Sequence, residues 1–400
     1  MPRNFPVELI DHVIDYLRYD THSLEACALT CRSWLPRSRY HLFWRILVFN
    51  PPQLLRLAQV VDGTPALGAL IERLIVLELA PEEWPEMDYR YDAYTKALPL
   101  LAEKLTKVKY VRFDTSKWGA LPWPIHESLY DLPHRLNSLT TLALRCVAFD
   151  TYEDLFRLVA GCPNLSVLYC FALQWESDTL HNTEFWHGHV RPPKLRSIRL
   201  TLPPMFVLLD WLRAIASHTA LNTTEFRMVE IDDLPHDNPG ALWQIMGPSL
   251  SYTTVSFSPG DPRSSPLTLP EGTVDKYLSL AHNTELRSFH YIALVDPHID
   301  VQILLDMLTS ITSHRLEQVV LDICRFHAPP RWVPYDKIDD LLAQSQFSTV
   351  KELVIRSAPQ MESGRSSLFS LYALLFPKAH ARGILSVLKC DEDHSCQALE

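Results

Sequence analysis

Glycine is scarce in this chain, which has only 11 glycines in 400 residues, against 30 prolines. Loops that cradle a phosphate need glycine, because the backbone must approach the ligand closely. Neither a Gly-x-Gly-x-x-Gly pattern nor a P-loop pattern occurs. The sequence therefore predicts no nucleotide-binding loop, and we expect no cofactor.

Long hydrophobic runs and an excess of positive charge are also missing. No stretch of eighteen uncharged apolar residues occurs, so we expect neither a membrane-spanning helix nor secretion. The net charge is -10, which argues against general nucleic-acid binding, because such binding needs a basic surface. We therefore predict a cytoplasmic or nuclear protein without nucleic-acid or membrane partners.

The eight cysteines predict neither disulfides nor a metal site. Most lie inside apolar runs, as is typical of reduced, buried thiols. Cys390 and Cys396 flank His394, but zinc sites normally place paired cysteines about two to four residues apart. Three histidines in residues 181–189 are interpreted as part of a surface loop, because no pattern makes three ligands converge. No Gly-x-Ser-x-Gly elbow occurs, so we expect no catalytic residues and no metal.

What the chain does contain is a short helical segment at its N terminus. Pro6 and Glu8 suit the first turn of a helix, and apolar residues follow at helical spacing. These are Leu9, Ile10, Val13, Ile14 and Leu17. The polar residues 20–23 predict a turn and a cap for a second helix, and Ser33 is predicted to cap a third that contains Trp34. Three short helices in about forty residues bury little apolar surface, so we expect them to need a partner.

In their order along the chain, these residues resemble the F-box family. Its pattern runs Leu-Pro-x-Glu, an apolar helix, a Cys-Arg-x-Trp segment and a closing aromatic residue. The matching residues are Pro6, Glu8, Leu9, Ile10, Leu24, Leu29, Cys31, Arg32, Trp34 and Trp44, with Phe5 where the family usually has leucine. The alternative is an N-terminal helical cap that has no partner.

The resemblance implies that this segment docks on a Skp-type adaptor. Phe5, Pro6, Leu9 and Ile10 are the first candidates for the contact, while Cys31 and Trp34 either share it or hold the helices together. The full set of predicted adaptor-binding residues is Phe5, Pro6, Glu8, Leu9, Ile10, Val13, Leu24, Cys31 and Trp34.

After a predicted boundary near residue 50, one apolar motif returns along the chain. It consists of an apolar residue, two spacers, an apolar residue, one spacer and an apolar residue. The clear copies are Leu74/Leu77/Leu79, Val108/Val111/Phe113, Leu139/Leu142/Leu144, Leu165/Leu168/Cys170, Leu195/Ile198/Leu200, Leu286/Phe289/Tyr291, Leu316/Val319/Leu321 and Val350/Leu353/Ile355. Looser copies are Leu221 with Phe226/Met228 and Leu250 with Val255/Phe257.

Successive copies start about 30 residues apart, which is typical of a leucine-rich-repeat solenoid. Segments between the motifs, such as 154–160 and 301–311, have helical period. One strand and one helix cannot bury their apolar faces alone, so neighbouring repeats must stack. We predict an α/β fold with a curved parallel sheet and outer helices. The predicted domains are 1–50 as the F-box, 51–365 as about ten repeats, and 366–400 as a C-terminal cap and acidic tail.

The face of the sheet away from the helices is predicted to bind a ligand. Residues between and just after the buried positions of each motif point to that face. Arginine occupies it repeatedly, as do aromatic side chains. The predicted substrate-binding residues are Arg112, Arg145, Tyr169, Phe171, Arg199, Arg227, His290 and Arg356. Because arginine binds carboxylate and phosphate groups bidentately, the pattern favours an acidic or phosphorylated peptide. The alternative is that the arginines pair with neighbouring acids or with water.

An F-box followed by leucine-rich repeats resembles the substrate-recognition subunits of Skp/cullin/F-box ubiquitin ligases. The resemblance implies a non-catalytic adaptor whose partners are a Skp-type protein, through it a cullin, and a protein substrate held by the repeats. Such a subunit acts by proximity, since it raises the effective concentration of the substrate near a ubiquitin-charged enzyme. The alternative is an interaction scaffold built from the same parts for a purpose unrelated to ubiquitin.

Overall fold

The structure is a computed structural model of the whole chain. The residues it describes are 6–77, 93–114, 131–149, 151–175, 194–201, 211–212, 221–230, 238–258, 272–292, 297–323, 333–357 and 365–389. The chain divides into two compact parts, 1–193 and 194–400, and each is described by itself.

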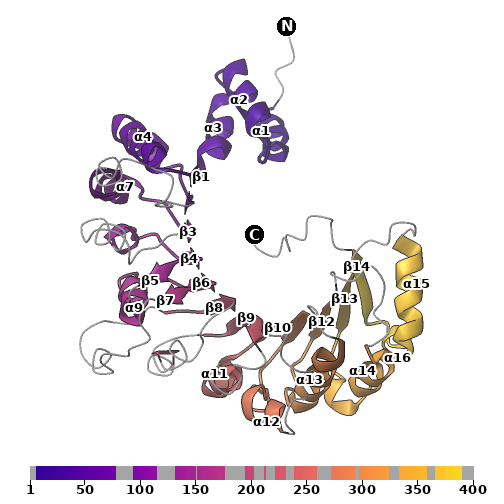
Figure 1. Cartoon of the computed structure of the whole chain (residues 1–400). Helices are drawn as coiled ribbons and strands as arrows, with labels where there is room; N and C mark the ends of the chain where they lie inside the picture. Colours follow the sequence, from indigo (N-terminus) through magenta and orange to yellow (C-terminus); the bar gives the residue numbers. More distant parts are fainter. Residues whose placement is uncertain are drawn as a thin grey trace. The chain divides into compact units, whose positions relative to one another are not determined.

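The first part begins with a helical head, residues 7–43. Its helices are α1 (Val7–Tyr16), α2 (Thr21–Thr30) and α3 (Leu35–Phe43), as predicted (Figure 1). Asp20 caps α2 by accepting a hydrogen bond from the Ser23 N–H at 3.0 Å. The predicted capping role of Ser33 is wrong: the N-cap of α3 is Trp34, and the Ser33 hydroxyl lies 3.1 Å from the Cys31 thiol instead.

The rest of the first part is a parallel sheet with helices on one side (Figure 1). Its strands, in spatial order, are β1 (Arg45–Val48), β2 (Arg73–Val76), β3 (Tyr110–Asp114), β4 (Thr141–Arg145) and β6 (Val167–Phe171). The intervening elements are α4 (Pro51–Gly63), α5 (Pro65–Gly68), η1 (Ala93–Ala97), α7 (Leu98–Lys104) and α9 (Tyr152–Ala160). Two short strands, β5 (Ala148–Phe149) and β7 (Gln174–Trp175), pair beside α9.

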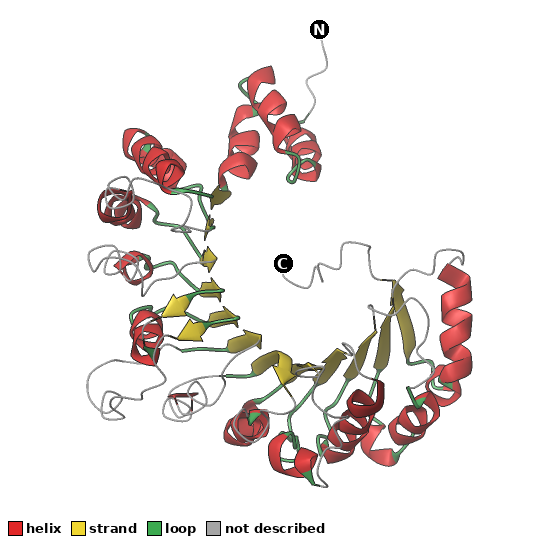
Figure 2. Ribbon diagram, viewed as in Figure 1, coloured by secondary structure: helices red, strands yellow, loops and turns green. Residues whose placement is uncertain are grey.

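The second part repeats this arrangement (Figure 2). Its parallel strands, in spatial order, are β8 (Ser197–Thr201), β9 (Thr223–Glu230), β10 (Tyr252–Ser258), β11 (Ser288–Ile292), β12 (Gln318–Ile323), β13 (Glu352–Ser357) and β14 (Leu385–Lys389). The helices are α11 (Pro239–Met246), η4 (Gly247–Ser249), α12 (Thr273–Tyr277), α13 (Pro297–Ser310), α14 (Tyr335–Leu342), η5 (Ser345–Phe347), α15 (Arg365–Leu375) and α16 (Pro377–Ala381).

A backbone ladder joins each repeat to the next. The carbonyl of Trp44 accepts the N–H groups of Glu72 and Arg73, both at 2.9 Å. The same double acceptance recurs at the carbonyls of Glu72, Lys109 and Thr140 in the first part and of Arg196, Asn222, Ser251, Arg287 and Glu317 in the second. The predicted fold class, α/β with three N-terminal helices followed by leucine-rich repeats, is confirmed.

The register of the first predicted repeat is wrong. Leu74 pairs with Val111 and Val76 with Phe113, so the motif here is Ile71/Leu74/Val76 rather than Leu74/Leu77/Leu79. Residues 71–79 contain apolar residues at both sets of positions, so spacing alone could not choose between them. The side chains of Ile71, Leu74 and Val76 are all fully buried, whereas Leu79 lies outside the described residues.

The two looser repeats have regular spacing, with threonine at the middle position. Thr253 pairs with Thr224, and Val255 pairs with Phe226. Both threonines are fully buried, and their hydroxyl oxygens lie 2.9 Å apart. The Trp243 indole N–H donates to the Thr224 hydroxyl at 3.1 Å. Because a buried hydroxyl is tolerated only when it is hydrogen-bonded, this network explains how threonine replaces leucine here.

The sheet extends beyond both predicted boundaries of the repeat region. Strand β1 lies inside the segment assigned to the F-box, and β14 lies inside the segment assigned to the C-terminal cap. Arg382 takes the first apolar position of the last repeat, because Leu385 pairs with Leu353. Its guanidinium donates to three carbonyl groups, at 2.6 to 3.3 Å; these belong to Leu342, Phe347 and Val350. Within the described part of the chain, no helix is long and apolar enough to cross a membrane.

Candidate functional site

Helix α1 leaves most of its apolar side chains exposed. Ile14 is fully buried inside the head, but Leu9, Val13 and Tyr16 are 51%, 55% and 77% exposed. These three residues are spaced at i, i+4 and i+7, so they form one outward row, which we call the α1 stripe. The apolar pattern predicted as a single stripe is therefore divided between the core of the head and its surface.

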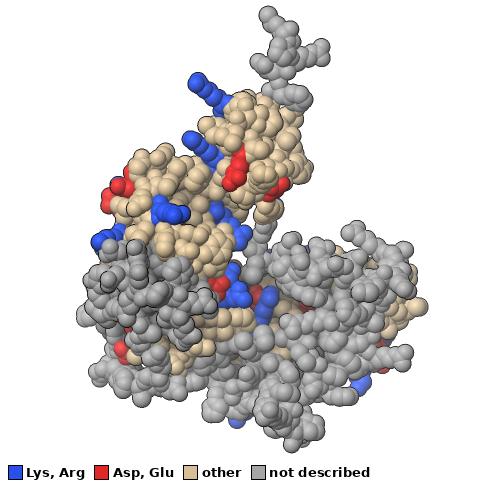
Figure 3. All heavy atoms as spheres, turned by 45° about the horizontal axis from the view of Figure 1, so that its top comes forward, with Lys and Arg blue, Asp and Glu red and all other residues tan. Residues whose placement is uncertain are grey.

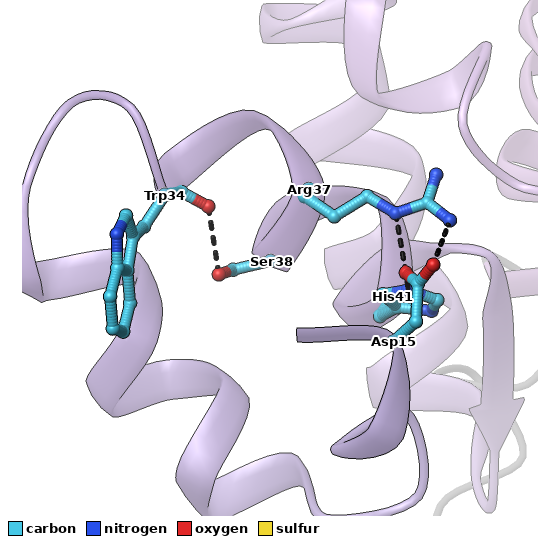
Figure 4. Close-up of polar contacts among 5 residues, drawn as sticks. All are labelled: Asp15, Trp34, Arg37, Ser38 and His41. Atoms are coloured by element: carbon cyan, nitrogen blue, oxygen red, sulfur yellow. Dashed lines mark hydrogen bonds and ion pairs between the residues drawn. The ribbon is translucent and has the colours of Figure 1, made fainter. Parts of the chain in front are cut away.

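An ion-paired clamp sets the rotation of α1 against α3 (Figure 4). Arg37 donates to both carboxylate oxygens of Asp15, at 2.5 and 2.8 Å, and His41 Nε2 lies 2.7 Å from the same carboxylate. The hydrogen bond from Arg37 is the main reason why the pKa of Asp15 falls from 3.8 to about 2. The Ser38 hydroxyl donates to the Trp34 carbonyl at 2.9 Å, within the first turn of α3. Through Asp15, the contacts with Arg37 and His41 hold α1 against α3 with Leu9, Val13 and Tyr16 exposed.

Replacing Asp15 with asparagine is expected to loosen α1. A pKa lowered in the folded state stabilises the fold above about pH 4, and this stabilisation is lost as the pH falls toward 2. Because Asp15 and Arg37 are about one-third exposed, we expect an effect of about 1 kcal/mol after allowing for solvent screening. Amide hydrogen exchange in α1 at pH 6 should then be about fivefold faster in the variant.

The matched control is Glu25→Gln on the exposed side of α2, which should leave α1 exchange unchanged. An Asp15→Asn variant whose α1 amides exchange at the wild-type rate would show that the clamp does not hold the helix.

The predicted adaptor-binding residues do not all lie on the surface. Pro6, Glu8, Leu9, Val13 and Cys31 are exposed, and Ile10 and Trp34 are half-buried. All seven side chains are therefore accessible to a partner. Leu24 is only 1% exposed, which places its side chain in the core of the head rather than on a docking surface. Phe5 lies outside the described residues.

The predicted adaptor-binding set omits four exposed apolar side chains of the head, namely Tyr19, which is 59% exposed, and three others. Val7 is 55% exposed, Tyr16 77% and Leu29 87%. Tyr16 could have been found, because it extends the row of Leu9 and Val13 by one helical turn. Figure 3 shows uncharged residues over much of the visible side of the head, with basic and acidic side chains among them. A hydrogen bond with Ser33 lowers the pKa of the exposed Cys31 thiol.

The predicted arginines of the first part share one buried carboxylate. Arg112 and Arg145 both pair with Asp114, Arg112 closely and Arg145 at 3.7 Å. The Arg145 guanidinium also stacks over the Phe171 ring, 5.1 Å from its centroid. Tyr169 lies beside Ala143 in the sheet register and is half-buried. We call this group the Arg112–Asp114–Arg145 cluster.

A second cluster of the same composition lies on β8 and β9. Arg199 Nε is 3.0 Å from Glu225 Oε2, and Arg227 Nε pairs with Glu225 Oε1. Glu225 pairs with Arg199 across the strands, and Arg227 pairs with Thr201. Arg227 therefore follows the buried positions of its repeat, rather than lying between them as predicted, because the regular motif ends at Phe226.

A third cluster joins His290, Asp322 and Arg356 on β11, β12 and β13. Asp322 Oδ2 lies 3.7 Å from His290 Nε2 and 3.8 Å from Arg356 Nη1. His290 is 5% exposed, and burial lowers its pKa although Asp322 opposes the shift. The His290 ring is therefore neutral near pH 7. In all three clusters the arginines pair with acidic side chains on the same or a neighbouring strand. This agrees with the alternative prediction that they pair with neighbouring acids.

Among the described residues, no group of three or more histidine, cysteine or acidic side chains could hold a metal ion. The histidines of 181–189 and the Cys390–Cys396 segment lie outside the described residues, so the expectation of no metal there stays a prediction.

No family model matches the chain, and no curated protein resembles it in sequence. Among solved structures, it is similar to one of the Rad7 and Elc1 complex from yeast, with 12% sequence identity over 90% of this chain and 91% of that chain. The TM-score is 0.34, and a likeness at this level carries no argument about fold or function.

Proposed function

We propose that this protein is the substrate-recognition subunit of a Skp/cullin/F-box ubiquitin ligase. The helical head docks on a Skp-type adaptor, and the repeats hold a protein substrate. The chain itself is non-catalytic, and the partner complex supplies the ubiquitin-charged enzyme.

The observation that carries the proposal is the exposed α1 stripe. Leu9, Val13 and Tyr16 form an exposed apolar row on a helix that buries Ile14 and is held to α3 through Asp15. Exposed apolar rows at this spacing are a common way for a helix to enter a hydrophobic groove of a partner. The row belongs to the same helix as the Pro6, Glu8, Leu9 and Ile10 positions that resemble the F-box pattern.

Reconstitution with purified components tests the proposal. The full chain, mixed with a purified Skp-type adaptor, should elute as a one-to-one complex in size-exclusion chromatography. Addition of the cullin and its ubiquitin-charged enzyme should then yield ubiquitin transfer to proteins captured by the chain. A chain that stays monomeric at micromolar adaptor concentrations would contradict the proposal.

The second candidate is a scaffold that binds the adaptor without leading to ubiquitin transfer. Removal of the head should abolish turnover of the substrate if the chain is a ligase subunit. It should leave turnover unchanged if the chain is a scaffold. Such a truncation must keep Arg45–Val48, because β1 pairs with β2 and its removal would leave a strand of the sheet unpaired. Deletion of residues 1–43 removes the three helices of the head and leaves β1 in place.

A further inference from the structure

We infer that Arg73, on β2, binds a carboxylate side chain of an acidic protein segment. The inference rests on the proposed function and deepens it, since it names the class of substrate that the first part of the chain would hold. Arg73 is not one of the predicted substrate-binding residues.

Arg73 lies on the face of the sheet away from the helices. Leu74 and Val76 are fully buried between the sheet and the helices, and side chains alternate along a strand, so Arg73 projects from the other face. In the register of the sheet, Arg73 lies between Arg45 of β1 and Tyr110 of β3. Arg73 is half-buried and Arg45 is exposed. A ligand on this face can therefore reach both arginines.

Two aromatic rings orient the guanidinium group of Arg73. Its Cζ atom lies 4.4 Å from the centroid of the Tyr110 ring and 5.6 Å from that of the Trp44 ring. Such stacking fixes the plane of the group before a ligand arrives. The Nε atom of Arg73 is buried without a hydrogen-bond partner, whereas the two terminal nitrogens are not buried. They offer parallel N–H donors, which match the two oxygens of a carboxylate.

Arg73 differs from the predicted arginines of the first part in having no acidic partner among the described residues. Arg112 and Arg145 both pair with Asp114 on the same face. Asp114 comes four residues after Tyr110 on β3, which is about 13 Å along the strand. This separation exceeds the screening length of about 8 Å at physiological ionic strength. A carboxylate can therefore bind Arg73 without displacing an internal partner.

The neighbours of Arg73 suit an acidic segment that also carries an apolar side chain. Arg45, beside it in the register, adds positive charge, and the preceding Glu72 pairs with Lys109 at 3.2 Å. Leu47 is 38% exposed and projects from the same face as Arg45, because Val48 is buried on the other. Side chains on one face of an extended peptide are also two residues apart. The geometry therefore favours a carboxylate with an apolar residue two positions away.

Binding of the full chain to two pools of fluorescent peptides tests the inference. Both pools have leucine two positions before and after a central residue, and degenerate uncharged residues elsewhere. The central residue is glutamate in one pool and glutamine in the other. In fluorescence polarisation at low salt, we expect the glutamate pool to bind at least about fivefold more tightly.

Two substitutions of Arg73 separate the planar donor pair from charge alone. Arg73→Gln should reduce the preference for glutamate to less than about twofold. Arg73→Lys keeps the charge but loses the planar fork, so it should bind the glutamate pool at least about threefold more weakly than the wild-type chain. The matched control is Arg56→Gln, which removes an exposed arginine from α4 and should leave the preference unchanged.

Equal binding of the two pools by the wild-type chain would overturn the inference, as would an unchanged preference in Arg73→Gln. Self-association of the chain that Arg73→Gln abolishes would assign the surface to a second copy and overturn it too. Should the Arg73 variants fail to fold, NMR titration of the wild-type chain replaces them. Acetate, but not acetamide, should shift the side-chain N–H signal of Arg73, and equal effects of both would contradict the inference.

Adaptor binding is measured separately in size-exclusion chromatography. A chain that binds the adaptor but shows no preference for glutamate refutes only this inference. A chain that binds no adaptor refutes the proposed function instead.

Discussion

Replacing Leu9 with aspartate is expected to reduce the affinity of the full chain for a Skp-type adaptor by more than about 100-fold. Burial of a leucine side chain in an interface contributes about 1.5–3 kcal/mol, and a charge in the same apolar contact adds a desolvation cost. Leu9 is 51% exposed in the free chain, so the substitution removes little of the core of the head. Isothermal titration calorimetry with the purified adaptor measures the loss.

Val60→Asp is the matched control for Leu9→Asp. Val60 is 47% exposed on α4, within the repeats rather than the head, and it also lies inside a helix. The control should bind the adaptor as the wild-type chain does. Undiminished binding by Leu9→Asp, with the repeats still folded, would rule out the α1 stripe as the docking surface.

Replacing Asp339 with alanine is expected to destabilise the C-terminal repeats by about 3 kcal/mol. Asp339 is 1% exposed, and its carboxylate accepts the backbone N–H groups of Lys378 and Ala379 at 2.8 and 2.9 Å. It thus caps the start of α16 from the neighbouring helix α14. Its loss leaves two donors without their acceptor, each at a cost of about 1–3 kcal/mol when buried. Denaturant unfolding, followed by amide exchange in α16, measures the effect.

The adjacent residue provides the control, because Asp340 is exposed and pairs only at the surface with the Lys378 ammonium, at 2.6 Å. Asp340→Ala should change stability by less than about 0.5 kcal/mol, since exposed ion pairs contribute little. Equal effects of the two substitutions would show that the cap formed by Asp339 is not important for stability.

The repeats were predictable because their apolar residues recur at constant spacing. Every described strand from β3 to β13 on the main sheet lies on a predicted motif, including the two looser copies. The register of a strand was predictable only where its apolar residues fit the motif in a single way. Residues 71–79 offered two patterns, and Thr224 and Thr253 hid the regular spacing because their hydroxyls are satisfied by each other and by Trp243.

For the candidate sites, the sequence predicted where residues lie along the fold better than it predicted which side chains they contact. Arg199 and Arg227 lie on the expected face, but their partner Glu225 was not identified, because the register of β9 was misassigned by two residues. On the head, periodicity located the apolar residues of α1. It could not show that Ile14 is buried while Val13 is exposed, because this depends on the angle at which α3 packs.

The α/β class, the three-helix head and the stacking of repeats could all be inferred from the residues in their order. These follow from local periodicity and from the need of each strand and helix to bury an apolar face. The three-dimensional structure was needed to show which side chains of α1 are exposed and which carboxylate each arginine contacts. Both depend on residues brought together from different helices or strands, such as Asp15 with Arg37 and Arg199 with Glu225. Contacts of that kind leave no periodic trace along a single chain.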